Sequence, residues 1–244
     1  MHQFDDHPRP YLRAGGLAYL AIILLGLFGE TLVRGTLIVP GDGLATAAAI
    51  AGAPGLWRAG LAGDLLMHVL DVPLIVLFYL LLRPVSRPLA LATTAFNLVQ
   101  TAVLVANKQT LLAPLLLATA TGPSALPPNV LASLTLTALN LHGLGFGVGL
   151  IFFGVACLIR GALIVRAPYL PSALGWLLGA AGVSYLLNSL ALLLAPSLAA
   201  VLFPWVLLPA LVGEGALSLW LLVRGIDAEA WAKFGKTAEQ GGAA

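Results

Sequence analysis

Charged side chains are scarce in this sequence. Lysine, arginine, aspartate and glutamate make up only 9% of its 244 residues, while hydrophobic residues make up 60%. A soluble domain is about a quarter charged, so too few polar groups are present to cover a surface that faces water. This shortage excludes an ordinary soluble domain, and we expect the apolar excess to face lipid.

Cysteine is nearly absent as well. Cys157 is the single one, which excludes a disulfide within the chain and any cluster of thiolate metal ligands. The formal net charge is only +2, and the basic residues are scattered rather than gathered in one run. We therefore expect no nucleic-acid partner, and the lipid bilayer is the first partner that the composition indicates.

Long apolar runs are what the sequence has instead. A membrane-spanning helix needs about 20 apolar residues. The chain has six such stretches, at 12–33, 58–82, 88–106, 130–159, 170–194 and 198–223. They predict an all-α integral membrane bundle of six transmembrane helices. We expect residues 1–226 to form one membrane domain and residues 227–244 to form a short polar cytoplasmic tail.

Basic residues fall mostly on one side of the six predicted spans. Nine of the twelve share a side if the spans alternate, including Arg160 and Arg166 after the fourth span. Only Arg34, Arg58 and Lys108 fall on the other side. Loops rich in lysine and arginine stay in the cytoplasm. The asymmetry predicts cytoplasmic N and C termini in a multi-pass protein.

Two segments between the spans carry local signals. Asp42 precedes the short apolar stretch 44–51, and aspartate is a favoured residue at helix N-termini. We therefore expect a short helix there, on the outer face of the membrane. Residues 110–118 fit two alternatives, because they either extend the third span or re-enter the membrane.

Several ionisable residues lie within the predicted spans, where each costs on the order of 2.5–3.5 kcal/mol on insertion scales. Asp64, His68 and Asp71 are spaced i, i+4, i+7, which places them on one helix face. Such residues persist only if they face protein, water or one another. We predict a shared polar core whose candidates for ligand binding or proton relay are Asp64, His68, Asp71, Asn140, His142, Tyr185, Asn188 and Glu214.

A structural role fits the same pattern, because buried polar groups can tie helices together. The residues that we expect to form ion pairs near the outer ends of the spans are Glu30, Arg34, Asp42, Arg58 and Lys108, with Asp64 as a further acid.

The leading functional prediction is binding or transport of a small solute, a proton or a lipid, without a cofactor. One alternative is a metal-dependent enzyme with His68, His142 and Asp71 as ligands. A second is a b-type haem held by the two histidines. A third is an accessory subunit bound to other membrane proteins. The residues alone leave catalysis open.

Short motifs along almost the whole chain resemble a known family. They include Phe28-Gly29-Glu30, Val39-Pro40-Gly41-Asp42, Leu141-His142-Gly143, Phe203-Pro204-Trp205 and Gly213-Glu214. Together they resemble the bacterial membrane family described as domain of unknown function 4386. The resemblance implies a multi-pass helical protein of a bacterial inner membrane and transfers no activity. Relatives often have Asp where this chain has Asn140 and Asn188, which weakens a metal or proton role for these two positions.

Overall fold

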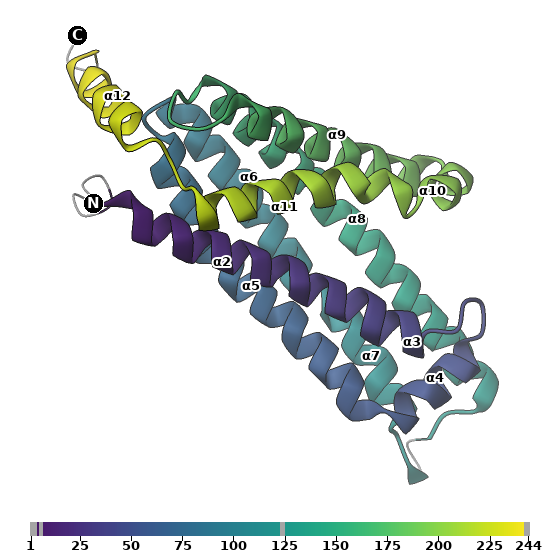
Figure 1. Ribbon diagram of the computed structural model, residues 1–244. Helices are drawn as coiled ribbons and strands as arrows, with labels where there is room; N and C mark the ends of the chain where they lie inside the picture. Colours follow the sequence, from purple (N-terminus) through teal and green to yellow (C-terminus); the bar gives the residue numbers. More distant parts are fainter. Residues whose placement is uncertain (1–3, 5–6, 123–124, 242–244) are drawn as a thin grey trace. The chain divides into compact units, whose positions relative to one another are not determined.

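The structure is a computed structural model that describes residues 4, 7–122 and 125–241. In this part of the chain the regular secondary structure is helical (Figure 1). Six helical stretches are long and apolar enough to cross a membrane: Pro8–Leu37, Pro54–Leu82, Arg87–Ala118, Pro128–Arg166, Ser172–Leu194 and Trp205–Val223. The prediction of six spanning helices is confirmed, and the protein is a multi-pass membrane protein.

The first stretch changes its winding near its end. Helix α2 (Pro8–Leu27) passes into the wider π-helical turns of η1 (Phe28–Arg34) and then into α3 (Gly35–Leu37). Wide turns within α-helices are rare and occur frequently at functional sites. Here they carry Glu30 and Arg34, two of the residues predicted to form ion pairs.

The third stretch has a break instead. One residue, Lys108, separates helix α6 (Arg87–Asn107) from α7 (Gln109–Ala118), and its backbone angles are helical, with φ −63° and ψ −19°. Residues 110–118 therefore continue the third helical stretch. The break again coincides with a charged residue.

The second stretch and the segment before it follow the predicted pattern. Asp42 caps α4 (Gly43–Gly52), because its Oδ1 accepts a 2.8 Å hydrogen bond from the backbone N–H of Ala45. This confirms the predicted cap and the short helix. Helix α5 (Pro54–Leu82) continues through Pro73. It carries the Asp64, His68 and Asp71 triplet, all three of them buried.

The fourth and fifth stretches are α8 (Pro128–Arg166) and α9 (Ser172–Leu194). Arg160, predicted to follow the fourth span, lies inside α8 with only 2% of its surface exposed. That prediction was wrong, because a guanidinium in a long apolar helix is tolerated when protein groups surround it. Arg160 therefore does not count among the basic residues of the predicted cytoplasmic loops. The excess of basic residues on that side is smaller by one, but it remains on the same side.

The boundary predicted for the sixth span was also wrong. Residues 198–223 contain the end of α10 (Pro196–Leu202), the single turn η3 (Trp205–Leu207) and α11 (Leu208–Val223). Phe203 is extended, with φ −75° and ψ 138°, as expected for a residue that precedes a proline. The apolar run therefore continues across a break that hydropathy alone does not show.

The polar segment after the sixth stretch forms a helix, α12 (Ala228–Gly241), which includes Trp231. Asp227 begins it by accepting hydrogen bonds from the backbone N–H groups of the second and third residues that follow. The Trp231 ring packs edge-on against Tyr169, with ring centroids 4.8 Å apart. Burial of the Tyr169 phenol raises its pKa above the usual range.

The chain divides into two compact units. Unit 1 comprises Met1–Leu20, Leu70–Thr101 and Gly147–Ala244, and unit 2 comprises Ala21–Val69 and Ala102–Phe146. In unit 2, α4 lies beside α7 (Figure 1). The indole N–H of Trp57, which is 2% exposed, donates a 2.9 Å hydrogen bond to the Leu111 carbonyl in the apolar core of this unit.

In unit 1, α9 lies beside α11, and α8 meets α9 at two pairs of glycines (Figure 1). A Cβ on either residue of the pair Gly154 and Gly182 would collide with the backbone carbonyl of the other, and the same holds for Gly161 and Gly175. Lipid provides no hydrophobic force between helices, so close backbone approach at small residues is what holds them together.

We expect Gly161→Ala to destabilise unit 1 by about 1–3 kcal/mol, because the new methyl group would overpack the α8–α9 contact. Gly179→Ala is the matched control in α9, since a Cβ there meets no atom within 4 Å. Thermal unfolding of both variants in detergent measures the difference. Equal midpoints would contradict close packing at this glycine pair.

Candidate functional site

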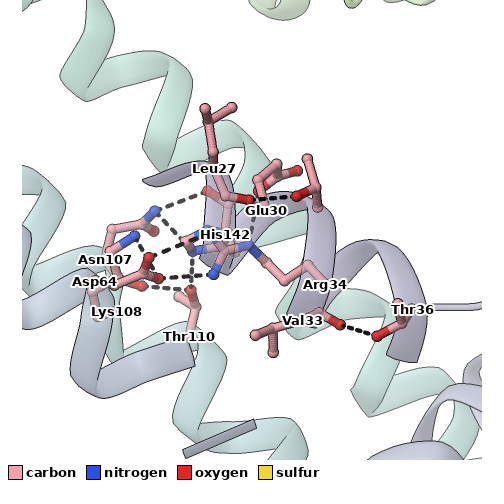
Figure 2. Close-up of polar contacts among 11 residues, drawn as sticks. Leu27, Glu30, Val33, Arg34, Thr36, Asp64, Asn107, Lys108, Thr110 and His142 are labelled. Carbon is pink, nitrogen blue, oxygen red and sulfur yellow. Dashed lines mark hydrogen bonds and ion pairs between the residues drawn. The ribbon is translucent and has the colours of Figure 1, made fainter. Parts of the chain in front are cut away.

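The carboxylate of Asp64 lies between two cations in unit 2 (Figure 2). Arg34 Nη1 is 2.8 Å from Asp64 Oδ2, and Arg34 Nη2 is 3.4 Å from Oδ1. Lys108 Nζ is 3.1 Å from Asp64 Oδ2. One carboxylate from the second stretch therefore joins cations from the first and third stretches.

The local structure of each helix brings these side chains together. Arg34 comes from the wide turns of η1, and Lys108 comes from the break between α6 and α7. Gly29 leaves the room that the contact needs, since a Cβ there would lie 2.7 Å from Asp64 Oδ1 and 3.0 Å from Arg34 Nη2. A larger residue at position 29 would therefore separate the acid from the guanidinium.

The charges of this cluster differ in their exposure. The side chains of Arg34, Asp64 and Lys108 are 10%, 1% and 5% exposed. Glu30 accepts a 2.8 Å hydrogen bond from Arg34 Nε, but its side chain is 62% exposed. The buried part of the cluster therefore holds two cations and one carboxylate, and the acid that balances the second cation lies at the surface of the unit.

A histidine borders the cluster. Asn107 Nδ2 lies 3.1 Å from Nδ1 of His142 and 2.9 Å from its backbone oxygen, and Thr110 Oγ1 lies 3.3 Å from the same Nδ1 (Figure 2). An amide NH₂ only donates, so a hydrogen bond from Asn107 requires an unprotonated Nδ1 on His142. The Lys108 ammonium also lies 5.9 Å from the centre of the Phe146 ring.

His68 adds an unsatisfied polar atom on the same helix face. It follows Asp64 by one turn of α5 and is only 3% exposed. Its Nε2 is buried and has no hydrogen-bond partner within the described ranges. A buried polar nitrogen without a partner is costly, so this atom favours a polar group from outside the chain.

Unit 1 has a different polar cluster, centred on Asp71. Asp71 Oδ2 accepts hydrogen bonds from the Thr101 hydroxyl and, at 3.2 Å, from Asn97 Nδ2. Asn97 Oδ1 in turn accepts from Arg160, whose guanidinium carbon lies 4.3 Å from the centre of the Phe78 ring. Asn97 thus links the buried arginine to the buried acid.

Glu214 is the second acid of unit 1, and two phenols bind it. Tyr19 donates a 3.0 Å hydrogen bond to Oε2, and Tyr185 donates to Oε1. Both carboxylate oxygens are therefore occupied. The sequence pointed to Glu214 and Tyr185 but missed Tyr19 and Arg160, because a lone tyrosine in an apolar run and an arginine near a span end are both common without any buried role.

The predicted residues therefore divide between the units. Asp64, His68 and His142 belong to unit 2, whereas Asp71, Tyr185 and Glu214 belong to unit 1. Asn140 is exposed and Asn188 is half-buried, and neither side chain joins a cluster in the described part of the protein.

The ion pairs predicted near the outer ends form in part. Arg34, Glu30, Asp64 and Lys108 pair as expected. The Asp42 carboxylate caps α4 instead, because the backbone N–H groups at a helix start compete for it. Arg58 is exposed and makes no ion pair with any residue that the structure describes.

Metal ligation requires several converging side chains. Among the described residues, no group of three or more His, Cys, Asp or Glu side chains is placed to hold a metal ion. His68 and His142 lie in unit 2, while the third predicted ligand, Asp71, lies in unit 1. The geometry gives the metal and haem alternatives no support, and they stay predictions from the sequence.

Asp64→Asn should destabilise the protein by about 3–5 kcal/mol, because it leaves two buried cations without their shared counter-charge. Glu30→Gln is the matched control, since it removes the exposed acid of the same cluster and should cost about 0–1 kcal/mol. Thermal unfolding in detergent at low and high salt separates the two. Equal losses would show that burial does not determine the strength of these ion pairs.

Comparison with known families identifies one match. A family model described as "Domain of unknown function (DUF4386)" matches residues 14–225, which confirms the resemblance found in the sequence motifs. Neither the curated proteins nor the solved structures include a match to the chain. The matched range includes all the residues of both polar clusters, so the clusters lie within the family's own domain.

Proposed function

This chain belongs to the DUF4386 family, described as a domain of unknown function, and we propose that it binds a small anion at the Arg34–Asp64–Lys108 cluster of unit 2. The anion carries a carboxylate, phosphate or sulfate group. The role of this binding is to capture the solute or to let it pass across the membrane.

The observation that carries the proposal is the excess of buried cations. Arg34 and Lys108 both contact one carboxylate, and all three side chains are at most 10% exposed. The formal charge of these three groups is +1. A desolvated cation attracts an anion far more strongly than an exposed one does, because little water screens it.

The same geometry disfavours a cationic solute. Asp64 is the buried acid of unit 2, and cations tethered to the chain already contact both of its oxygens. A soluble cation would have to displace them, whereas an anion adds a partner to each. The guanidinium of Arg34 and the ammonium of Lys108 also have further N–H groups that can donate to an anion.

His68 supports a polar ligand beside the cluster. Its buried Nε2, one helical turn from Asp64, has no partner among the described groups. Neutral imidazole donates or accepts at this atom according to its tautomer. An acidic ligand that has a hydroxyl or a second oxygen could therefore contact the two cations with its acid group and form a hydrogen bond with this nitrogen.

Lys108→Met should weaken anion binding about thirtyfold or more, because removing one partner of a buried charge pair costs about 2–5 kcal/mol. Asp64→Asn should strengthen it, since the competing internal anion is lost. The measurement is the rise in unfolding temperature of purified protein with inorganic phosphate, sulfate, acetate or succinate, relative to chloride at equal ionic strength.

The opposite signs of these two effects separate ligand binding from a structural role. If the cluster only joins helices, both variants lose stability and neither changes its response to anions. Arg58→Met is the matched control, because it removes an exposed cation and should leave the response unchanged. A wild-type protein that none of the four anions stabilises would contradict the proposal.

A further inference from the structure

Three arginines line one cavity at an end of unit 1. The cavity has a volume of about 200 Å³ and is lined by Arg9, Arg13, Val223, Arg224 and Gly225. It lies where α2 begins and α11 ends (Figure 1). None of the residues of the proposed anion site belongs to it.

Helix packing brings these arginines together. Gly16 of α2 lies so close to α11 that a Cβ there would collide with the Ser218 carbonyl and the Leu222 backbone. The beginning of α2 is thereby fixed against the end of α11. Arg9 and Arg13 are four residues apart and share a face of α2.

The turn after α11 places the third arginine. Arg224 ends the helix, and its N–H and that of Gly225 both donate to the Trp220 carbonyl. Gly225 has φ +72°, in the left-handed region where glycine is favoured. The chain turns away there and leaves the Arg224 side chain at the cavity.

No described residue around this cavity forms an ion pair with its three arginines. All three arginines are exposed. Three guanidinium groups around one small volume repel one another. A phosphate relieves that repulsion, and its oxygens match the planar fork of each guanidinium.

An apolar cavity adjoins the basic one. Its volume is about 330 Å³, and Arg9 lines both. The other residues of its wall are His7, Pro8, Pro10, Ile226 and Ala228. A basic cavity that continues into an apolar one matches a molecule with an anionic head and a hydrocarbon chain, and it does not match a free inorganic ion.

We propose that these adjoining cavities bind an anionic phospholipid, with the phosphate at Arg9, Arg13 and Arg224 and part of an acyl chain against Ile226 and Pro8. The site lies at the ends of two spanning stretches, at the membrane surface that the charge asymmetry predicts to be cytoplasmic. Basic pockets at that surface bind anionic headgroups, which the anionic leaflet supplies.

The test compares phosphatidylglycerol with phosphatidylcholine by native mass spectrometry and thermal unfolding of the full chain in detergent. We expect phosphatidylglycerol to bind and stabilise the wild-type protein and phosphatidylcholine to do neither. The double variant Arg13→Gln/Arg224→Gln should raise the Kd for phosphatidylglycerol about thirtyfold, because each arginine near a membrane surface contributes about a fivefold share.

The matched control is Arg87→Gln/Arg166→Gln, which removes two exposed arginines from the same predicted side without touching the cavity. It should leave the Kd unchanged. Equal loss in both double variants would show general charge attraction and overturn the site. Competition by millimolar inorganic phosphate would also overturn it, since that result needs no apolar cavity. If the Arg13→Gln/Arg224→Gln protein is not monodisperse, the single variant Arg13→Gln replaces it, and an unchanged Kd there contradicts the proposal.

Discussion

A charge in hydrocarbon is stable only when the protein supplies its partner, and Asp64 shows how far that requirement shapes unit 2. Its carboxylate meets Arg34 from the first spanning stretch and Lys108 from the third. Without this carboxylate, burying either cation would cost several kcal/mol that no other buried acid of the cluster offsets. The regular helical geometry changes at the residues that make this contact. η1 widens at Arg34, the third stretch breaks at Lys108, and Gly29 leaves space beside the acid.

Unit 1 meets the same requirement with neutral donors. Asp71 is bound by Thr101 and Asn97, and Glu214 is bound by Tyr19 and Tyr185. The buried Arg160 reaches this network through Asn97 rather than through an ion pair with either acid among the described residues. Among the described residues, unit 2 buries two cations and one acid, whereas unit 1 buries two acids and one arginine. The proposed anion site lies in the unit with more buried cations than acids.

Close helix contacts provide the frame on which these clusters depend. Because lipid is as apolar as leucine, packing between helices must come from shape and polar contacts. The glycine pairs between α8 and α9, and Gly16 against α11, let backbones approach to the limit of contact. The same approach of α2 to α11 sets the arginines of the basic cavity side by side. Helix packing therefore determines both the close helix contacts of unit 1 and the placement of its exposed arginines.

The sequence by itself determined the class of the protein, the number of spans and the burial of Asp64, His68 and Asp71. Apolar length and helical periodicity are local properties, so they can be read from the sequence of each stretch by itself. Only the tertiary structure decided which groups meet. Arg34 contacts Asp64, which is 30 residues away in the sequence, and Tyr19 contacts Glu214, which is 195 residues away. Arg160 is a buried residue and not a charge in a loop. Partners so distant in the chain leave no local pattern, because the contact between them depends on how whole helices pack.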